Sequence, residues 1–235
     1  MGFPNKGAVH VATNLKKLVR PYATPLLVNI GKNRETTNVD AYKDYLSLID
    51  TFENTADAFV INISSPNTSG LRELFKPEFL TGFLAQLRAH TRRPLLLKLS
   101  PDLADAAFAE VLDTSLAAGV DGWIISNTTT AREINPVTQA PYFEAAGGVS
   151  GRPLAQRSLF LLKSAVNHLG ARRGDRLLIS AGGVSSPEDV FERLALGADL
   201  VQIYSALIFS GPGFLKKVAV AAESLEFSAI KAKNK

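Results

Sequence analysis

Short apolar runs recur along the chain, each about five residues long and each followed by small or polar residues. Apolar side chains fill almost every position of a run, which is typical of strands that are buried on both faces of a sheet. The pattern therefore predicts six strands, at residues 26–30, 59–63, 95–99, 122–125, 177–179 and 200–204.

The segments between these runs have the spacing of amphipathic helices, with apolar residues at i, i+3, i+4 and i+7. This stripe is clearest at residues 42–52 and 103–116, and a third one lies at 159–166. Ser186 followed by Pro187 has the form of an N-cap and a first helical position, and Gly197 marks the end of that helix. Strands and helices are thus predicted to alternate along the chain.

Strict alternation of strands and helices favours a parallel sheet with helices outside it. Polar residues follow every apolar run, whereas an open doubly wound sheet would carry one glycine-rich fingerprint after its first strand. A (β/α)8 barrel builds its site from the carboxyl ends of many strands, and closure requires eight of them. We therefore predict an α/β fold, a (β/α)8 TIM barrel of which six βα units are present. No linker divides the sequence, so residues 1–235 are predicted to form one barrel domain.

The composition excludes several classes of protein. The chain has 235 residues, of which 46% are hydrophobic and 20% charged, and this excludes an intrinsically disordered protein. It contains no Cys, which excludes disulfides, thiolate metal sites and cysteine nucleophiles. Its three His lie far apart, so we expect no bound metal. The net charge of +4 suits a small anionic ligand as well as a larger partner, but the basic residues are dispersed and we expect no nucleic-acid binding.

The segment from Ile61 to Arg72, with the sequence Ile-Asn-Ile-Ser-Ser-Pro-Asn-Thr-Ser-Gly-Leu-Arg, is the most informative part of the chain. By its residue types alone it is an Asx- and Ser-rich turn after a buried strand. The whole string, however, resembles the active-site segment of the dihydroorotate dehydrogenases, and specifically of the quinone-dependent class 2 enzymes. Class 2 enzymes use Ser as catalytic base where class 1 enzymes use Cys. Ser65, in a chain without Cys, therefore points to class 2.

Further motifs resemble those of the same family, in the family's order, up to about residue 215. They lie at residues 28–33, 98–102, 126–129, 147–154, 182–184 and 202–205. The opening residues 1–5 resemble an internal family motif that normally follows Asn-Arg. The resemblance therefore implies an N-terminally incomplete barrel that holds the last six βα units.

The resemblance also implies roles for individual residues. Ser65 resembles the base that removes a proton from C5 of dihydroorotate. A lone serine hydroxyl is a weak base, so a relay or strong hydrogen bonds are needed, and Thr68 is a candidate partner. The residues that resemble the family's substrate-binding set are Gly2, Phe3, Asn62, Asn67, Asn127 and Thr128. Those that resemble its FMN-binding set are Asn29, Asn62, Lys98, Ser126, Gly151, Gly183, Tyr204 and Ser205.

Elementary chemistry agrees with these roles. Side-chain amides both donate and accept hydrogen bonds, which suits the edges of a pyrimidine ring. A lysine at the end of a buried strand, as Lys98 is, is costly unless it is paired, and a negatively charged reduced flavin would pair it. The alternative is a lysine at the rim whose ammonium group reaches water. Residues 68–77 are predicted to form a mobile lid, with an ordinary long loop as the alternative.

As a class 2 enzyme, the chain would oxidise dihydroorotate to orotate with FMN and pass the electrons to quinone, in de novo pyrimidine (UMP) synthesis. The resemblance implies a peripheral location on the cytoplasmic side of the inner or cytoplasmic membrane, through an amphipathic segment ahead of the barrel. We find no such segment in this sequence, and without it a cytoplasmic location is expected. One alternative is an inactive truncated barrel fragment or pseudoenzyme of the same family. A weaker one is another phosphate-binding barrel enzyme, such as a flavin-free isomerase, which does not explain Asn29, Lys98 and the Ser65 loop together.

Overall fold

A parallel sheet of six strands forms the centre of the protein. The structure is a computed structural model, and it describes residues 5–18, 24–65, 70–132 and 147–233, with side chains up to residue 224. Each strand pairs in parallel with the next one in the chain. The strands are β1 (Leu27–Ile30), β2 (Ala58–Asn62), β3 (Leu95–Lys98), β4 (Gly122–Ile125), β5 (Leu177–Ala181) and β6 (Leu200–Gln202).

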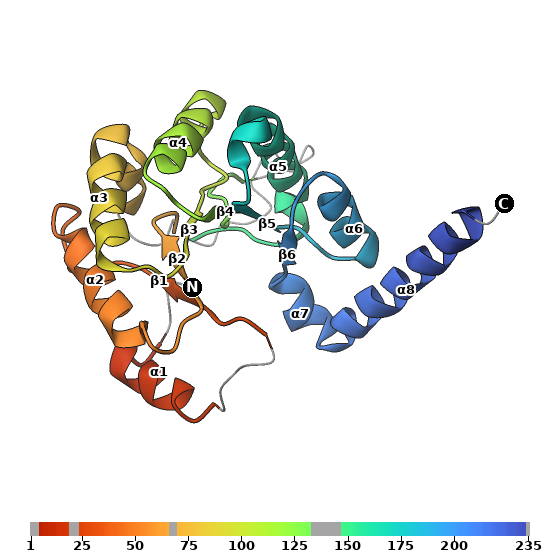
Figure 1. Ribbon diagram of the computed structural model, residues 1–235, viewed down its shortest axis with the longest axis horizontal. Coiled ribbons are helices and arrows are strands. Elements are labelled where there is room, and N and C mark those ends of the chain that lie inside the picture. Colours follow the sequence, from red (N-terminus) through yellow and green to blue (C-terminus); the bar gives the residue numbers. More distant parts are fainter. Residues whose placement is uncertain (1–4, 19–23, 66–69, 133–146, 234–235) are drawn as a thin grey trace.

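Helices lie along the convex side of this curved sheet, and the last one, Gly213–Lys233, extends away from it (Figure 1). They are α1 (Ala8–Leu15), α2 (Ala41–Phe52), α3 (Pro77–His90), α4 (Asp105–Ala117), α5 (Ala155–Leu169), α6 (Pro187–Ala195), α7 (Ser205–Ser210) and α8 (Gly213–Lys233). Short 3₁₀ helices lie at Leu71–Phe75, Arg152–Leu154 and Gly170–Arg173. The predicted six βα units of a (β/α)8 barrel are thus confirmed, whereas the extent of one domain over residues 1–235 stays a prediction.

The helix that begins at Pro187 has the start that its sequence predicts. The hydroxyl of Ser186 accepts a hydrogen bond from the backbone N–H of Asp189, and the Asp189 carboxylate accepts one from the backbone N–H of Ser186. This reciprocal capping satisfies N–H groups that would otherwise lack a partner at the helix start. Gly197 follows the end of α6, where its φ of 105° is a conformation that favours glycine.

Two layers of the apolar core lie on the two faces of the sheet, and a third, smaller cluster of Val184, Val190, Ala206 and Phe214 lies among α6, α7 and α8. The larger layer lies between the sheet and the helices. A smaller cluster covers the inner, concave face and consists of Val60, Leu96, Ile124, Ile179 and Ala181. Because successive residues of a strand point to opposite faces, each strand contributes alternate residues to the two layers.

Strand β6 differs from the expectation that every strand is buried on both faces. Leu200 is 51% exposed, and the strand ends at Gln202 rather than at residue 204. In the described part of the chain β6 pairs with β5 alone and β1 with β2 alone, so these two strands are the edges of the sheet. An edge strand lacks the neighbour that would cover it, which explains the exposure.

The lid predicted at residues 68–77 stays a prediction, and its described part packs against the core. Leu71, Leu74 and Phe75 form one 3₁₀ helix and are buried in the main apolar layer, with exposures of 0%, 2% and 3%. Side chains anchored in the core hold this segment against the body of the protein. Residues 71–75 are thus anchored in the core in this structure.

Candidate functional site

A cavity of about 530 Å³ opens at the carboxyl ends of the six strands. Every predicted site residue that the structure describes lines it: Asn29, Asn62, Ser65, Lys98, Ser126, Asn127, Thr128, Gly151, Gly183, Tyr204 and Ser205. The predicted Gly2, Phe3 and Asn67, and the suggested relay residue Thr68, lie outside the described residues. The volume is within the range of pockets that hold small molecules and cofactors.

The polar floor of the cavity follows from the alternation of the strands. The inner face of β2 carries Val60 and then Asn62, and the inner face of β3 carries Leu96 and then Lys98. The register pairs Asn62 with Lys98, so the two side chains emerge next to each other. Each strand thus buries an apolar residue in the inner cluster and presents a polar one two positions later.

A network of amides and hydroxyls fixes the cavity floor beside Ser65. The Oδ1 atom of Asn62 accepts from Nδ2 of Asn127 at 3.2 Å and from Oγ of Ser64 at 3.0 Å. Nδ2 of Asn127 also donates to Oγ of Ser64 at 2.8 Å, and the buried Tyr45 hydroxyl donates to the Asn62 carbonyl at 3.0 Å. Burial raises the pKa of Tyr45, so its hydroxyl stays protonated as a donor. With its oxygen engaged in the protein, Asn62 has its Nδ2 group to offer to a ligand.

Ser65 is 5% exposed and follows this network directly. Nε of Arg72 donates to the carbonyl of Ser64 at 3.2 Å, and its Nη1 contacts the Asp102 carboxylate at 2.7 Å. Nη2 of Arg72 reaches the carbonyl of Thr128 at 3.5 Å. One guanidinium thus ties together the connections that follow β2, β3 and β4. The sequence gives no signal for this link, because Arg72 and Asp102 are 30 residues apart.

Asp102 is the acceptor at the centre of that link. Its carboxylate accepts from the N–H of Thr130 at 2.7 Å, from the Thr130 hydroxyl at 2.8 Å and from the Thr129 hydroxyl. Burial alone would raise the pKa of Asp102, but the hydrogen bonds from Thr129, Thr130 and Arg72 together hold it below its ordinary value. Asp102 is therefore ionised at neutral pH.

Lys98 lies on the cavity floor, and its Nζ donates to Oε1 of Gln202 at 3.3 Å. Burial lowers the pKa of Lys98. A half-buried ammonium group with one neutral partner favours an anionic ligand in the cavity. Gln202 is a site residue that sequence reasoning missed, although its position two residues after Leu200 matches the pattern of the other strands.

Glycines form the opposite end of the cavity. Gly151, Gly182 and Gly183 have φ angles of 78°, 110° and 73°. A Cβ atom at Gly183 would lie 2.3 Å from Cα of Ala155, so no side chain fits there. The Ser205 hydroxyl donates to that of Ser150 at 2.9 Å, which links the start of α7 to the Gly151 segment. Close-packed glycine backbone beside hydroxyl groups is suited to an anion such as a phosphate.

Comparison with known proteins identifies the family. A model described as dihydroorotate dehydrogenase matches residues 1–225. The chain belongs to the dihydroorotate dehydrogenase family. It is 43% identical over 219 residues to the "Dihydroorotate dehydrogenase (quinone)" of Thermus thermophilus, and 38% identical over 218 residues to that of Nautilia profundicola. The match covers 93% and 92% of this chain but 61% and 58% of those relatives, so the chain spans about three fifths of their length.

Solved structures of the dihydroorotate dehydrogenase family have the same architecture. The enzyme of Eimeria tenella in complex with ferulenol superposes with a TM-score of 0.81 at 29% identity. That likeness covers 92% of this chain and 64% of the Eimeria chain. The family's barrel architecture thus applies to this chain.

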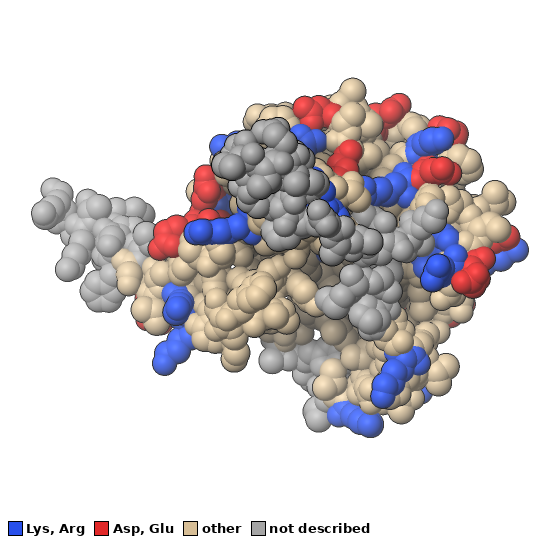
Figure 2. All heavy atoms as spheres, turned by 180° about the vertical axis from the view of Figure 1, so that it is seen from behind, with Lys and Arg blue, Asp and Glu red and all other residues tan. Residues whose placement is uncertain are grey.

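Three further features complete the description of the protein. In the described part of the chain, no helix has both the length and the apolar character that a bilayer crossing requires. Basic and acidic side chains are interspersed around the face shown in Figure 2. Within the same described residues, no three His, Asp or Glu side chains are grouped as metal ligands.

Proposed function

We propose that this chain oxidises dihydroorotate to orotate with FMN as cofactor and quinone as the final electron acceptor. The observation that carries the proposal is the cavity, which gathers residues of seven separate family motifs at the carboxyl ends of six strands. The family match and the relatives named as quinone-dependent enzymes support the reaction. The roles of the individual residues are part of this proposal.

The dihydroorotate dehydrogenase family is flavin-dependent, and the cavity fits FMN. The glycine cradle around Gly183 has no room for a side chain and suits the phosphate. Lys98 suits the pyrimidine edge of the isoalloxazine, where negative charge develops on reduction. Asn29, Ser126 and Tyr204 supply amide and hydroxyl groups along the cavity between these ends. When bound, FMN supplies the acceptor for the hydride that leaves C6 of the substrate.

The residues around Ser65 are suited to hold the substrate and take its proton. The Nδ2 group of Asn62 and the hydroxyl of Thr128 offer donors to the amide groups of the ring. Oγ of Ser65 would take the proton from C5 while its own hydroxyl proton passes through a hydrogen-bonded relay to solvent, and the hydride would leave C6 for the flavin, which leaves the C5–C6 double bond of orotate. Arg72 and the Asn62–Ser64–Asn127 network hold the backbone of Ser65 in place. Fixing a weak base against its proton is what such a reaction requires.

Electron transfer to quinone and a peripheral place on the cytoplasmic side of a membrane are the finer parts of the proposal. They rest on the motifs of class 2 enzymes and on the printed names of the relatives. An inactive member of the same family is the second candidate. The open edges of the sheet at β1 and β6, in the described residues, favour that alternative.

The test is to purify the chain, supply FMN and add dihydroorotate without oxygen. We expect a yellow protein with one FMN per chain, whose visible flavin absorbance bleaches on addition of dihydroorotate and returns on addition of a quinone. Uptake of FMN without bleaching would support the inactive alternative. Failure to bind FMN under conditions in which the protein is folded would refute the proposed function.

A further inference from the structure

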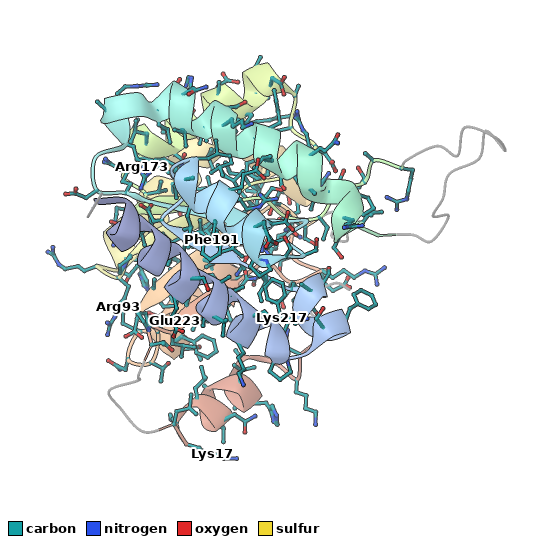
Figure 3. The ribbon with its side chains drawn as sticks, turned by 90° about the vertical axis from the view of Figure 1, so that its right-hand side faces the viewer. Lys17, Arg93, Arg173, Phe191, Lys217 and Glu223 are labelled. Atoms are coloured by element: carbon teal, nitrogen blue, oxygen red, sulfur yellow. The ribbon has the colours of Figure 1, made fainter. Side chains whose placement is uncertain are left out.

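Arg193 of α6 is buried in the interior, directly behind the glycine end of the cavity. Its side chain is 3% exposed. Its guanidinium donates to Oγ of Ser180 at 2.9 Å, to Oγ of Ser158 at 3.1 Å and to the carbonyl oxygen of Gly182 at 2.8 Å. Figures 1 and 3 show α6 flanked by α5 and α8. The guanidinium therefore lies between β5, α5 and the Gly182–Gly183 turn.

The positive charge of Arg193 has no carboxylate in contact with it. Among the described residues, no Asp or Glu oxygen comes within 4.0 Å of its nitrogen atoms, and its buried Nε has no hydrogen-bond partner. Asp189 on the same helix accepts instead from the N–H groups of Ser185 and Ser186 and from the Ser185 hydroxyl. The acceptors that Arg193 does have, two hydroxyls and a carbonyl, are neutral.

An arginine in this position is costly to bury, because the guanidinium stays protonated and neutral acceptors compensate its lost hydration only in part. Burial lowers the pKa of Arg193, which expresses the same cost. When a buried cation lies next to a ligand cavity, an anionic group of the ligand can compensate its charge. The cavity wall nearest to Arg193 is the turn to which it donates.

The peptide group between Gly182 and Gly183 lies between Arg193 and the cavity. The Gly182 carbonyl accepts from Arg193 and, at 2.7 Å, from Oγ of Ser158, so it points to the interior. The peptide bond between Gly182 and Gly183 is not among the cis bonds of the protein. In a trans peptide the C=O and N–H groups point in opposite directions, so the N–H of Gly183 points away from Arg193. Donation to the carbonyl also polarises the peptide and strengthens this N–H as a donor.

We propose that Arg193 is the interior counter-charge for the phosphate of the bound flavin nucleotide and acts through the Gly182–Gly183 peptide as a positioning residue. The inference rests on the proposed function, because the phosphate is that of FMN. A phosphate monoester carries nearly two negative charges at neutral pH. Arg193 should therefore raise the affinity for FMN and leave the affinity for riboflavin, which lacks the phosphate, unchanged.

The experiment measures the dissociation constants of FMN and riboflavin by quenching of flavin fluorescence. We expect Arg193→Met to weaken FMN binding by about tenfold or more and riboflavin binding by less than about twofold. Arg193→Lys keeps the charge and should keep most of the preference for FMN. Arg173→Met is the matched control, since Arg173 is paired with Asp199 and precedes β5, at the amino ends of the strands. It should leave the ratio of the two affinities unchanged.

Equal losses for the two flavins in Arg193→Met, or a loss in Arg193→Lys as large as in Arg193→Met, would overturn the proposal. If Arg193→Met does not fold, Ser180→Asp places a carboxylate beside Nη1 while Arg193 remains. The preference for FMN should then fall, and an unchanged preference would contradict the inference. A folded wild type that binds neither flavin refutes the proposed function by itself. Inorganic phosphate then tests Arg193: it should raise the melting temperature of the wild type more than that of Arg193→Lys or Ser180→Asp, and equal shifts would overturn the proposal.

Discussion

At the Ser65 end of the cavity Arg72 and Asp102 form an ion pair at 2.7 Å, whereas at the glycine end Arg193 lies buried with no carboxylate in contact among the described residues. Asp102 neutralises the charge of Arg72 before any ligand binds, so Arg72 can hold the backbone next to Ser65, the proposed weak base. The hydrogen-bond partners of Arg193 are all neutral, and Asp189 and Glu192 act on its charge only without direct contact, so a bound anion gains from it. The comparison separates positioning of the reacting atoms from affinity for the cofactor, and each of the following changes tests one side of it.

The largest effect is expected at Ser65. We expect Ser65→Ala to lower the rate of flavin reduction by dihydroorotate by about 10²–10⁴-fold, because a positioned general base contributes that much. The dissociation constant of FMN should stay the same. Ser64→Ala is the control, since it removes hydrogen bonds to Asn62 and Asn127 without removing the base, and should cost about tenfold. Stopped-flow absorbance measures both, and an unchanged rate in Ser65→Ala would remove that residue from the mechanism.

A methyl group at Gly183 tests the cradle at the opposite end. Gly183 and Gly119 have similar φ angles, 73° and 77°, but a Cβ atom at Gly183 meets the Ala155 backbone at 2.3 Å and one at Gly119 meets nothing within 4 Å. Gly119→Ala should therefore cost about 1–2 kcal/mol of unfolding free energy from backbone strain alone. Gly183→Ala should cost more and should also abolish FMN binding. Urea unfolding and flavin titration measure both variants. Equal losses of unfolding free energy in the two would contradict the close packing at Gly183.

The Asp102 ion pair gives a pH-dependent prediction. Its pKa is held below the ordinary 3.8, so the carboxylate stabilises the fold above that pH and loses this contribution as the pH falls through the lower, folded-state value. Asp102→Asn should lower the unfolding free energy by about 1–3 kcal/mol at pH 7, and the difference from the wild type should shrink below pH 3.8. Urea unfolding at several pH values measures it. A difference that does not change with pH would show that the charge of Asp102 is irrelevant.

Lys98→Met is expected to have the smallest effect on stability. The direction in which the melting temperature changes is what tests the role of Lys98. Burial lowers the pKa of Lys98, so the protonated lysine is unfavourable in the flavin-free fold, and the penalty is relieved only as the pH rises towards 10.5. At pH 7 the variant should melt about 2–4 °C higher than the wild type without flavin. With FMN bound, the wild type should melt at a higher temperature than the variant. Scanning calorimetry with and without FMN measures this, and a lower melting temperature without flavin would contradict it.

The sequence predicted the architecture well because local patterns determine it. The apolar runs predicted all six strands to within a few residues. The helical stripes matched α2, α4 and α5, and the capping residues predicted α6. Helix α3 was missed although Leu80, Phe83, Leu84 and Leu87 are buried with helical spacing, so its signal was present. Gln202 was also missed, although it lies two residues after Leu200, the spacing at which the other strands carry their polar site residues.

Other features depend on contacts between distant parts of the chain and leave no local pattern. The buried packing of Leu71 and Phe75 is one such feature, since a glycine next to polar residues gives the same sequence pattern in a lid and in a fixed turn. In the sequence alone, nothing distinguishes Arg193 from an exposed arginine on an amphipathic helix. Only the fold brings its side chain to Ser158, Ser180 and Gly182.

The most direct test of the account is an anaerobic single turnover of the FMN-loaded chain with excess dihydroorotate, in which reduced flavin and orotate are counted together. The account predicts one orotate for each flavin reduced, with both appearing at the same rate. A folded, FMN-loaded protein whose flavin stays oxidised, or whose flavin is reduced without formation of orotate, would contradict it.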